Sequence, residues 1–308
     1  MRVLLTGASG FVGRHLAADL IARGHGVCAA VRDPAALPPG AKLALIGDLG
    51  EPVDWAPLLQ GVDAVVHGAG IAHAGPGLPD DLYARVNRDA TLALAQAAAG
   101  RVNRFVFLSS IRAQSGPTST HALTEDDAPA PTDAYGRSKL EAENGLAAIP
   151  GLNATALRPV VVYGPGVRGN MGALAKLARL PAPLPFGALQ TPRSVVSVEN
   201  LAAAVAFALE AAEPARGAFI VADPEPIALG ALVAAMRAAL GRPAMLLPIP
   251  AALMGGALRA LRKGDAWERL SGAMTASPAR LVSLGWTPPV RSTPEGIRRW
   301  LAPGSRPA

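Results

Sequence analysis

The chain of 308 residues has few cysteines, few aromatic residues and few charges. Cys28 is the only cysteine, so no internal disulfide can form, and we expect a reducing compartment. Charged residues make up only 17% of the chain, yet no apolar run is long enough to span a bilayer. The first apolar segment starts at residue 2, which leaves no room for a signal peptide. We therefore expect a cytoplasmic protein without membrane insertion.

The net charge of +6 comes from basic residues that are spread singly along the chain. Nucleic-acid-binding proteins instead gather Lys and Arg in patches and stack bases on aromatic side chains. Aromatic residues are only 4% of this sequence, so we predict no nucleic-acid partner. Coding bias or attraction of an anionic substrate would each account for the charge. The five histidines show no metal-ligand spacing, and we predict no metal site.

Apolar segments and helical patterns alternate through the first half of the chain, which is typical of a parallel sheet covered by helices on both faces. The expected strands are Val3–Thr6, Val27–Arg32, Leu43–Ile46, Ala64–His67, Phe105–Ser109 and Thr155–Val162. The expected helices are Phe11–Arg23, Leu82–Ala99 and Ala134–Ala148. We predict an α/β fold of the Rossmann type, a doubly wound parallel sheet that gathers ligands at the carboxyl ends of its strands.

Three glycines, Gly7, Gly10 and Gly13, lie between the first strand and the first helix. The first would permit a tight turn, the second a close approach of the backbone to a pyrophosphate, and the third close packing of helix on strand. The helix N-terminus would then face the phosphates with free N–H groups and the positive end of its dipole. This arrangement predicts a dinucleotide site.

Tyr135 and Lys139 lie four residues apart after Asp133, which could cap a helix, so both side chains would share one helix face. We expect the Lys139 ammonium to lower the pKa of the Tyr135 phenol from its usual value of about 10, which would make it a usable acid/base group. Ser109 and Ser110 end a strand, where a hydroxyl can meet a substrate oxygen. Taken separately, each feature also fits an ordinary helix surface or a strand-end turn.

Together these features resemble the extended branch of the short-chain dehydrogenase/reductase superfamily, the NAD(P)-dependent epimerase/dehydratase family. The resemblance covers nearly the whole chain, since Leu157–Gly166 (LRPVVVYGPG) and Leu284–Pro288 (LGWTP) also match family segments. It implies catalysis by Tyr135, Lys139 and Ser110. It also implies cofactor contacts from Gly7, Gly10, Phe11, Val12, Gly13, Asp48, Leu49, Gly68, Ala69, Gly70, Asn87, Tyr135 and Lys139. A homodimer through the helices Leu82–Ala99 and Tyr135–Ala148 is implied as well.

One segment departs from the family pattern, because SSIRAQSG stands where members often have a serine or threonine followed by VYG. Counting back from Gly116 puts Ile111 at the position of the catalytic hydroxyl, and a one-residue insertion puts Ser110 there. We choose Ser110 because isoleucine cannot hydrogen-bond the reacting oxygen.

The second strand ends in VRDP, where dinucleotide folds contact the adenosine ribose. An arginine there can pair with the extra phosphate of NADP, whereas an acidic residue binds the ribose hydroxyls of NAD. Arg32 precedes Asp33, so we favour NADP(H) over NAD(H), with Arg14 as a second contact. The alternative is a solvated Arg32 that leaves Asp33 to bind ribose.

The regular alternation of strands and helices ends at Tyr163, where glycine and proline turns are followed by mixed helices and strands. We predict a Rossmann domain over 1–163 together with about 193–223, a smaller interleaved substrate-binding lobe over 164–192 and 224–302, and a tail over 303–308. By resemblance to nucleotide-sugar enzymes, the substrate diphosphate would contact Gly169, Asn170, Arg193 and, less strongly, Arg269. Ser110 would bind the substrate at its reacting oxygen.

The resemblance points to a 4-epimerase or 4-ketoreductase of a UDP- or dTDP-sugar in surface-polysaccharide synthesis. A ketoreductase consumes and exchanges NADPH, so the argument from Arg32 tilts slightly towards that activity. Two alternatives stay open. One is a reductase of a hydrophobic ketone, such as a dihydroflavonol-like or hydroxysteroid-like compound. The other is a module that senses NADP(H) without chemistry.

Overall fold

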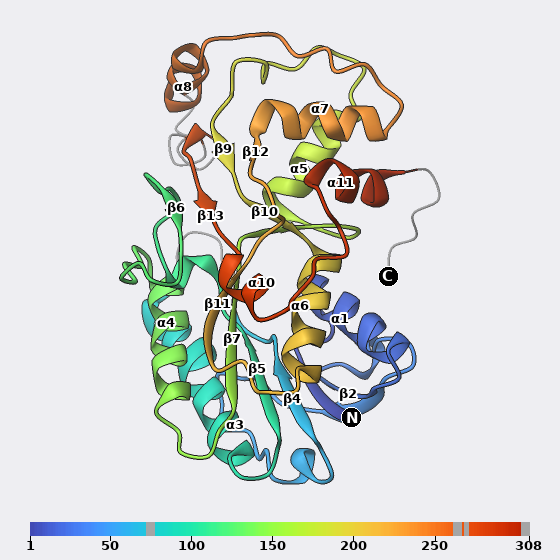
Figure 1. The fold of residues 1–308 in the computed structure, drawn as a ribbon, viewed down its shortest axis with the longest axis vertical. Helices are drawn as coiled ribbons and strands as arrows, with labels where there is room; N and C mark the ends of the chain where they lie inside the picture. Colours follow the sequence, from blue (N-terminus) through green and yellow to red (C-terminus); the bar gives the residue numbers. More distant parts are fainter. Residues whose placement is uncertain (72–77, 261–266, 268–270, 303–308) are drawn as a thin grey trace.

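The computed structural model describes residues 1–71, 78–260, 267 and 271–302. Its centre is a parallel sheet of seven strands in the order β11-β7-β5-β4-β1-β2-β3 (Figure 1). The order reverses between β1 and β4, as in a doubly wound fold, and the predicted fold class is confirmed. The strands are β1 (Arg2–Thr6), β2 (Gly26–Val31), β3 (Lys42–Leu45), β4 (Ala64–His67), β5 (Arg104–Leu108), β7 (Ala154–Pro159) and β11 (Gly217–Val221).

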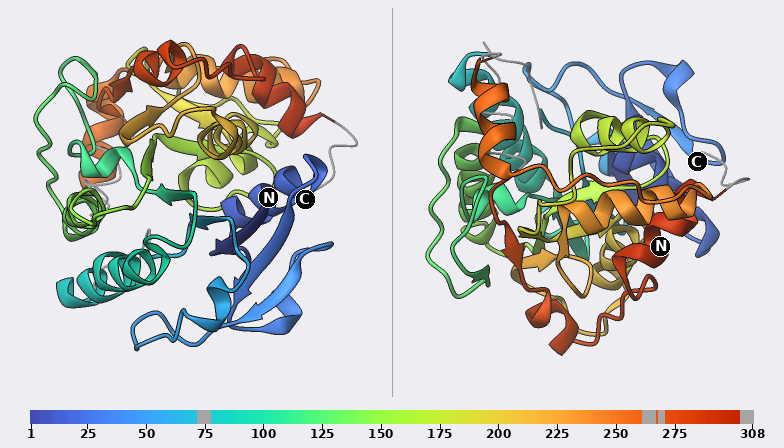
Figure 2. Two further views of the ribbon diagram at one scale, coloured as in Figure 1. Left: turned by 60° about the horizontal axis from the view of Figure 1, so that its bottom comes forward. Right: turned by 90° about the horizontal axis from the view of Figure 1, so that it is seen from above.

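Helices cover both faces of the sheet. On one face α1 (Phe11–Ala22) packs against α6 (Val198–Glu210). On the other lie α4 (Ala134–Ala147) and a continuous helical stretch made of α2 (Asp80–Tyr83), the π-helical turn η3 (Ala84–Asp89) and α3 (Ala90–Ala98). Figure 2 shows the two layers from further directions. Alternate residues of β1 enter the two cores, since Val3 and Leu5 face one layer and Leu4 faces the other.

The segment expected as a single strand over Thr155–Val162 is divided. β7 ends at Pro159, and after Val160 the chain forms β8 (Val161–Tyr163), which pairs with β10 (Val195–Ser197) outside the central sheet. A proline has no N–H to donate to a ladder, and it marks the point where the chain leaves the sheet. The strand-like RSVVSV segment is similarly shared between β9 (Pro192–Arg193) and β10.

Beyond the carboxyl ends of the central strands lies a second group of elements, drawn at the top of Figure 1. A third core of side chains from α5, α7 and α11 holds it together. Two short sheets, β9–β12 and β6–β13, complete it. Its elements are α5 (Gly169–Ala178), β12 (Ile227–Ala228), α7 (Leu229–Ala239), α8 (Ala251–Ala260), β13 (Thr275–Ala276) and α11 (Thr293–Leu301), with β6 (Ala122–Leu123) reaching it from the sheet domain. The short helix α10 (Ala279–Ser283) packs instead beside β11 of the central sheet.

The short 3-10 turns are η1 (Pro34–Ala36), η2 (Pro57–Leu59) and η4 (Ile111–Ala113). Within the described residues, no helix is long and apolar enough to cross a membrane.

Candidate active site

The glycine turn between β1 and α1 is built as the sequence predicts. Gly7 has a φ of +72°, and a Cβ there would lie 2.6 Å from the backbone of Gly68 and Ala69. A Cβ on Gly13 would run into the Gly7 carbonyl oxygen. A Cβ on the exposed Gly10 would meet only that same oxygen, at 3.3 Å. Protein packing therefore explains two of the glycines, and the third leaves a backbone surface open to a ligand.

Gly10 is also the N-cap of α1, and no side chain caps the helix. The side chains of Phe11 and Val12 follow on its first turn, with Val12 packed against the first core. Phe11 lies beside the turn Gly164–Gly166, since a Cβ on Gly166 would be 3.9 Å from its ring. Free N–H groups at an uncapped helix end bind phosphate well, so this turn fits the pyrophosphate of a dinucleotide.

The loop after β4 brings three predicted cofactor residues together. A Cβ on Gly70 would lie 2.7 Å from Asn87 Oδ1 and 3.4 Å from Lys139 Nζ. Asn87 is fully buried in η3, where its Nδ2 donates to the carbonyl of Ile71 and to Ser138 Oγ. Residues from β4, η3 and α4 thus converge at the carboxyl end of the sheet, where the sequence places the nicotinamide half of the cofactor.

His67 fixes the base of this loop. Thr91 Oγ1 donates to the Asn87 carbonyl, so it accepts from His67 Nε2 at 2.9 Å. His67 Nδ1 then accepts from Thr6 Oγ1 at 2.7 Å, and that hydroxyl accepts from the N–H of Ala69. Burial, with a smaller effect of Lys139, lowers the pKa of His67 to about 3. The imidazole is therefore neutral and serves as a fixed link.

Ser110 and Tyr135 form the centre of the predicted catalytic group. Asp133 caps α4 by accepting from the N–H of Gly136 at 2.7 Å, which starts the helix just before Tyr135. The hydroxyl of Ser110 is hydrogen-bonded to the Tyr135 phenol and accepts from the N–H of Arg112. Ile111, the alternative by counting, is buried in η4.

The pKa of Tyr135 differs from the sequence-based expectation. Burial raises it above the usual value, the hydrogen bond from Ser110 opposes this, and Arg112 also lowers it. Asp133 and Tyr83 act in the raising direction. Arg112 is therefore a cation that lowers the pKa of this phenol, and the net shift is upward where the sequence analysis expected a lowering.

Lys139 follows Tyr135 by four residues on α4 and is held by the sheet. Its Nζ donates to the Leu108 carbonyl at 2.9 Å and lies 4.5 Å from the centroid of the Phe107 ring. Only 4% of the residue is exposed, and burial lowers the pKa of the amine to about 8, although Glu143 opposes this. The amine can therefore change its charge near neutral pH.

The residues predicted for the adenosine end also meet. Arg32 Nη1 donates to Asp48 Oδ2 at 3.0 Å in an exposed ion pair, and Asp48 Oδ1 accepts from the N–H of Gly50. The Gly50 bond is the main reason that the pKa of Asp48 is lowered. Leu49 packs on the second core. Asp33 caps η1 by accepting from the N–H of Ala35.

The predicted substrate residues belong to the elements beyond the sheet. Gly169 and Asn170 begin α5, are exposed, and Gly169 has a φ of +64°. Arg193 is half-buried in β9, which pairs with β12, and burial lowers the pKa of its guanidinium. Arg269 lies outside the described residues.

Sequence reasoning missed Arg112. Its Nη2 donates to Asp133 Oδ2 at 2.6 Å, while its buried Nη1 has no hydrogen-bond partner. The sequence offered one sign of its role, which is its position two residues after Ser110. That spacing does not show that the turn η4 directs the Arg112 side chain towards the start of α4.

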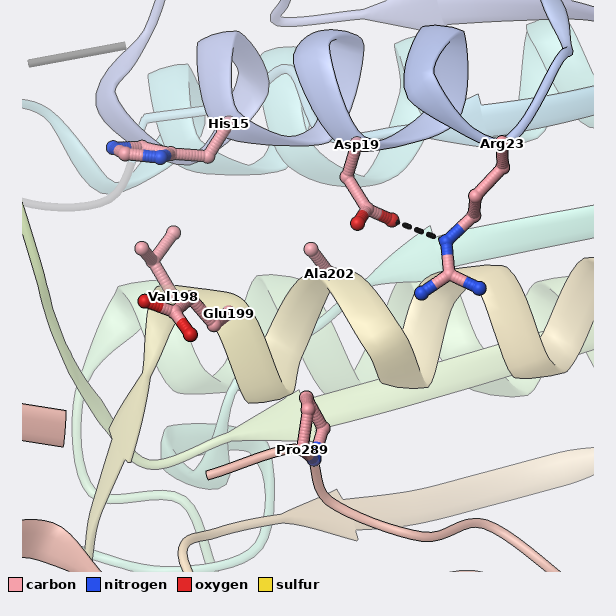
Figure 3. Close-up of a pocket in the computed structure, with 7 residues that line it drawn as sticks. All are labelled: His15, Asp19, Arg23, Val198, Glu199, Ala202 and Pro289. Atoms are coloured by element: carbon pink, nitrogen blue, oxygen red, sulfur yellow. Dashed lines mark hydrogen bonds and ion pairs between the residues drawn. The ribbon is translucent and has the colours of Figure 1, made fainter. Parts of the chain in front are cut away.

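A separate pocket lies between α1 and α6 (Figure 3). Its polar groups are already paired, since Asp19 accepts from Arg23 at 2.7 Å and Glu199 accepts from Arg299 at 2.8 Å. His15 bonds the Pro165 carbonyl. The pocket contains none of the predicted catalytic side chains.

Comparison with known proteins gives the family. Residues 3–222 match the NAD dependent epimerase/dehydratase family. The chain belongs to this family. Among curated relatives, a UDP-glucose 4-epimerase of Vibrio cholerae is 32% identical over 96% of this chain and 93% of its own length. A ceramide reductase of Caulobacter vibrioides is 30% identical over 96% of this chain and 88% of its own.

Solved structures of the family share the fold. The Thermus thermophilus UDP-glucose 4-epimerase in complex with NAD superposes with a TM-score of 0.73 and 28% identity, over 98% of each chain. NAD(P) binding is thus a property of this family, and the turn at Gly10 and the cluster around Gly70 fit such a cofactor. Among the residues that the structure describes, no group of three or more His, Cys, Asp or Glu side chains could hold a metal ion.

Proposed function

We propose that this protein catalyses NAD(P)-dependent oxidation or reduction at C4 of a nucleotide-activated sugar, as a 4-epimerase or a 4-ketoreductase. The observation that carries the proposal is the hydrogen-bonded pair of Ser110 and Tyr135 beside the buried amine of Lys139. Similarity to a UDP-glucose 4-epimerase over nearly the whole chain supports the sugar substrate. We also propose that the product enters surface-polysaccharide synthesis.

Tyr135 is the acid/base group of the proposed reaction. A bound nicotinamide dinucleotide would supply or accept the hydride. The phenol would donate the proton to the C4 oxygen during reduction and remove it during oxidation, while Ser110 holds that oxygen by a hydrogen bond. Lys139, fixed by the Leu108 carbonyl, would bind the nicotinamide ribose. Gly70 and Asn87 would line the same part of the cofactor site.

We propose a preference for NADP(H). Arg32 is 70% exposed and its ion pair with Asp48 is exposed as well, so the pair contributes little stability and the guanidinium can turn towards a phosphate. Asp33 caps η1, which ties its carboxylate to Ala35. A preference for NADP(H) favours a ketoreductase, which consumes the reduced coenzyme. Similarity to the Vibrio cholerae UDP-glucose 4-epimerase favours an epimerase instead.

The substrate would bind between the sheet and the elements beyond it. We propose that 1–163 and about 193–223 hold the cofactor, and that 164–192 and 224–302 form the substrate lobe. Gly169, Asn170 and Arg193 would contact the diphosphate, since an arginine fork can bind phosphate oxygens in pairs. Arg269 is a further contact in this proposal.

The purified protein should be offered UDP- and dTDP-4-keto-6-deoxysugars with NADPH or NADH, and separately UDP-glucose and UDP-galactose with NAD. A ketoreductase will consume reduced coenzyme, and an epimerase will interconvert the hexoses without net consumption. Tyr135→Phe should lower turnover about 100-fold or more, because general acid/base catalysis contributes that much. Unchanged turnover in this variant would overturn the mechanism, and no turnover with any sugar would favour a sensing module.

A hydrophobic ketone is the second candidate substrate, because a ceramide reductase is also similar over most of this chain. The two candidates differ at Arg193, which a neutral ketone would not need. Arg193→Ala should raise the KM for a nucleotide sugar, whereas full activity of this variant on its true substrate would favour the ketone.

We further propose a homodimer through α3 and α4. Their exposed positions Ala93, Asn144 and Ala147 are small or polar and allow close approach of a second copy. Light scattering on the purified protein tests this, and a monomer at micromolar concentration would reject it.

A further inference from the structure

The catalytic face of α4 extends one turn beyond Lys139. Tyr135, Lys139 and Glu143 are spaced by four residues, so their side chains follow one another along a single face of the helix. Glu143 is only 8% exposed, and its charge acts directly on the Lys139 amine. An ionised carboxylate in such a position requires charged or hydrogen-bonding partners.

Arg158 on β7 supplies the opposite charge. Its Nε donates to both carboxylate oxygens of Glu143, at 3.0 and 3.1 Å, and its Nη2 donates to Oε2 at 2.5 Å. Arg158 is 5% exposed. Its Nη1 donates to the side chain of Gln114, which follows η4. The guanidinium therefore joins β7, α4 and the segment after Ser110.

Ser109 is the third partner. Its hydroxyl donates to Glu143 Oε1, and its backbone N–H donates to the Leu157 carbonyl of β7 at 2.8 Å. The residue that precedes Ser110 is thus fixed to both α4 and β7. A buried pair of this kind is expensive to desolvate, and hydrophobic residues of similar volume are often at least as stable. Stability alone therefore does not account for a buried charge at this place.

We propose that Glu143 is a positioning residue of the active site: it keeps Lys139 charged from one helical turn away and, through Ser109 and Arg158, fixes the strand end that carries Ser110. The inference rests on the proposed function, because it gives the ion pair of Glu143 and Arg158 a role in positioning the proposed catalytic residues. Glu143 itself does not touch the reacting atoms.

Other titratable groups face Lys139 from the elements packed around it. His67 on β4 is neutral because burial lowers its pKa to about 3. Tyr135 is neutral at neutral pH because burial raises its pKa. Arg158 on β7 is the remaining charged group and pairs with Glu143. Glu143 is therefore the source of negative charge that supports the ammonium.

The test is an NMR titration of the amine in full-length protein labelled with ¹³C at lysine Cε. The chain has four lysines, and Lys139→Met assigns the signal of interest. In wild type we expect Lys139 to titrate near pH 8, since burial lowers its pKa to about 8, well below the usual lysine value of about 10.4. Glu143→Gln should move the midpoint to lower pH, because the amine loses its nearby negative charge.

The variant Arg158→Met distinguishes an effect of the Glu143 charge on the Lys139 midpoint from an effect of disturbed packing. If the pair were only structural, both single variants would shift the Lys139 midpoint in the same direction. The proposal instead expects no decrease in Arg158→Met, since the Lys139 ammonium then serves as the counter-charge that keeps Glu143 ionised. Glu141→Gln is the matched control, because Glu141 is an exposed carboxylate on the same helix that pairs with Arg88. It should leave the midpoint unchanged.

The double variant Glu143→Gln, Arg158→Met covers the case in which a single variant fails to fold, because it leaves no unpaired buried charge. Its midpoint should also lie below that of wild type, and a wild-type midpoint in the double variant or in Glu143→Gln would overturn the proposal. Activity is a second readout, with an optimum that should move with the midpoint. A shift of the NMR midpoint in a protein without sugar-nucleotide activity would reject the proposed function and keep the role of Glu143.

Discussion

At the Tyr135 phenol, burial and nearby charge act in opposite directions. Burial raises the pKa, while the hydrogen bond from Ser110 and the charge of Arg112 lower it. Arg112 also holds Asp133 at 2.6 Å and so offsets a carboxylate that raises the same pKa. One side chain therefore acts on the phenol both directly and through its partner.

Replacing Arg112 tests this at the residue scale. In Arg112→Gln the phenol loses a positive charge and Asp133 loses its counter-charge, and both changes raise the pKa of Tyr135. The rising limb of kcat/KM for oxidation, which requires the deprotonated phenol, should therefore move to higher pH. The control is Arg85→Gln, an exposed arginine of η3 that pairs with Asp81, and it should leave the limb in place. An unchanged limb in Arg112→Gln would remove the assigned role.

The sequence predicted that Ser110 and Tyr135 share one site, because the family resemblance places one at a strand end and the other at a helix start. It did not predict that Arg112 lowers the pKa of the phenol or that the net shift is upward. Helical spacing gives the common face of two residues but not the depth of each side chain. Lys139 reaches the Leu108 carbonyl and the Phe107 ring of the neighbouring strand, and these contacts depend on tertiary packing.

At the scale of one element, the glycines of the turn before α1 are required for different reasons. The Gly13 position is filled by the Gly7 carbonyl, and the Gly10 position is open except for that same oxygen at 3.3 Å. Gly10 has a φ of −76° and a ψ of 173°, which alanine also adopts.

The two alanine variants should therefore behave differently. Gly13→Ala should cost about 1–3 kcal/mol of stability, because an extra methyl in a filled site forces backbone shifts. Gly10→Ala should keep the thermal midpoint near that of wild type and weaken NAD(P) binding, since its methyl would lie where the backbone meets the pyrophosphate. Chemical denaturation and coenzyme fluorescence titration measure the two effects. Equal loss of stability in both variants would contradict this division.

Most elements could be predicted from alternating apolar segments, and their bounds agree within one or two residues for the strands of the first half. The segment after Ala154 could not, since TALRPVVV is apolar apart from Thr155 and Arg158. Periodicity does not distinguish one long strand from two shorter ones that belong to different sheets. The position of Pro159 is the only local sign of the break.

At the scale of the whole molecule, one buried carboxylate joins the sheet to the elements beyond it. Asp223, two residues after the end of β11, is 1% exposed. It accepts from Tyr163 Oη at 2.7 Å, from Asn200 Nδ2 at 2.7 Å, from the N–H of Ser197 and from Thr293 Oγ1. β8, α6 and α11 thus meet at one residue.

Tyr163→Phe should lower the free energy of unfolding by about 1.5–3 kcal/mol, the usual contribution of a hydrogen bond to a charged group. A double-mutant cycle with Asp223→Asn isolates the pair, and we expect a coupling energy of at least about 0.5 kcal/mol. Denaturant titration of the four proteins gives this value. Strictly additive losses would show that the two residues act independently.

The route of the chain between these regions has a consequence for recombination within the family. The chain leaves the central sheet after β7, returns through α6 and β11, and leaves it again at β12. α6 packs on α1 and supplies much of the first core. A chimera that takes everything after residue 163 from a relative would therefore combine α1 of this protein with the relative's α6. The side chains of that half of the first core would not be matched to those of α1. Crossovers placed on both sides of the α6–β11 segment would keep the α1–α6 contact within one parent, while Leu281 and Trp286 of the same core would still come from the relative.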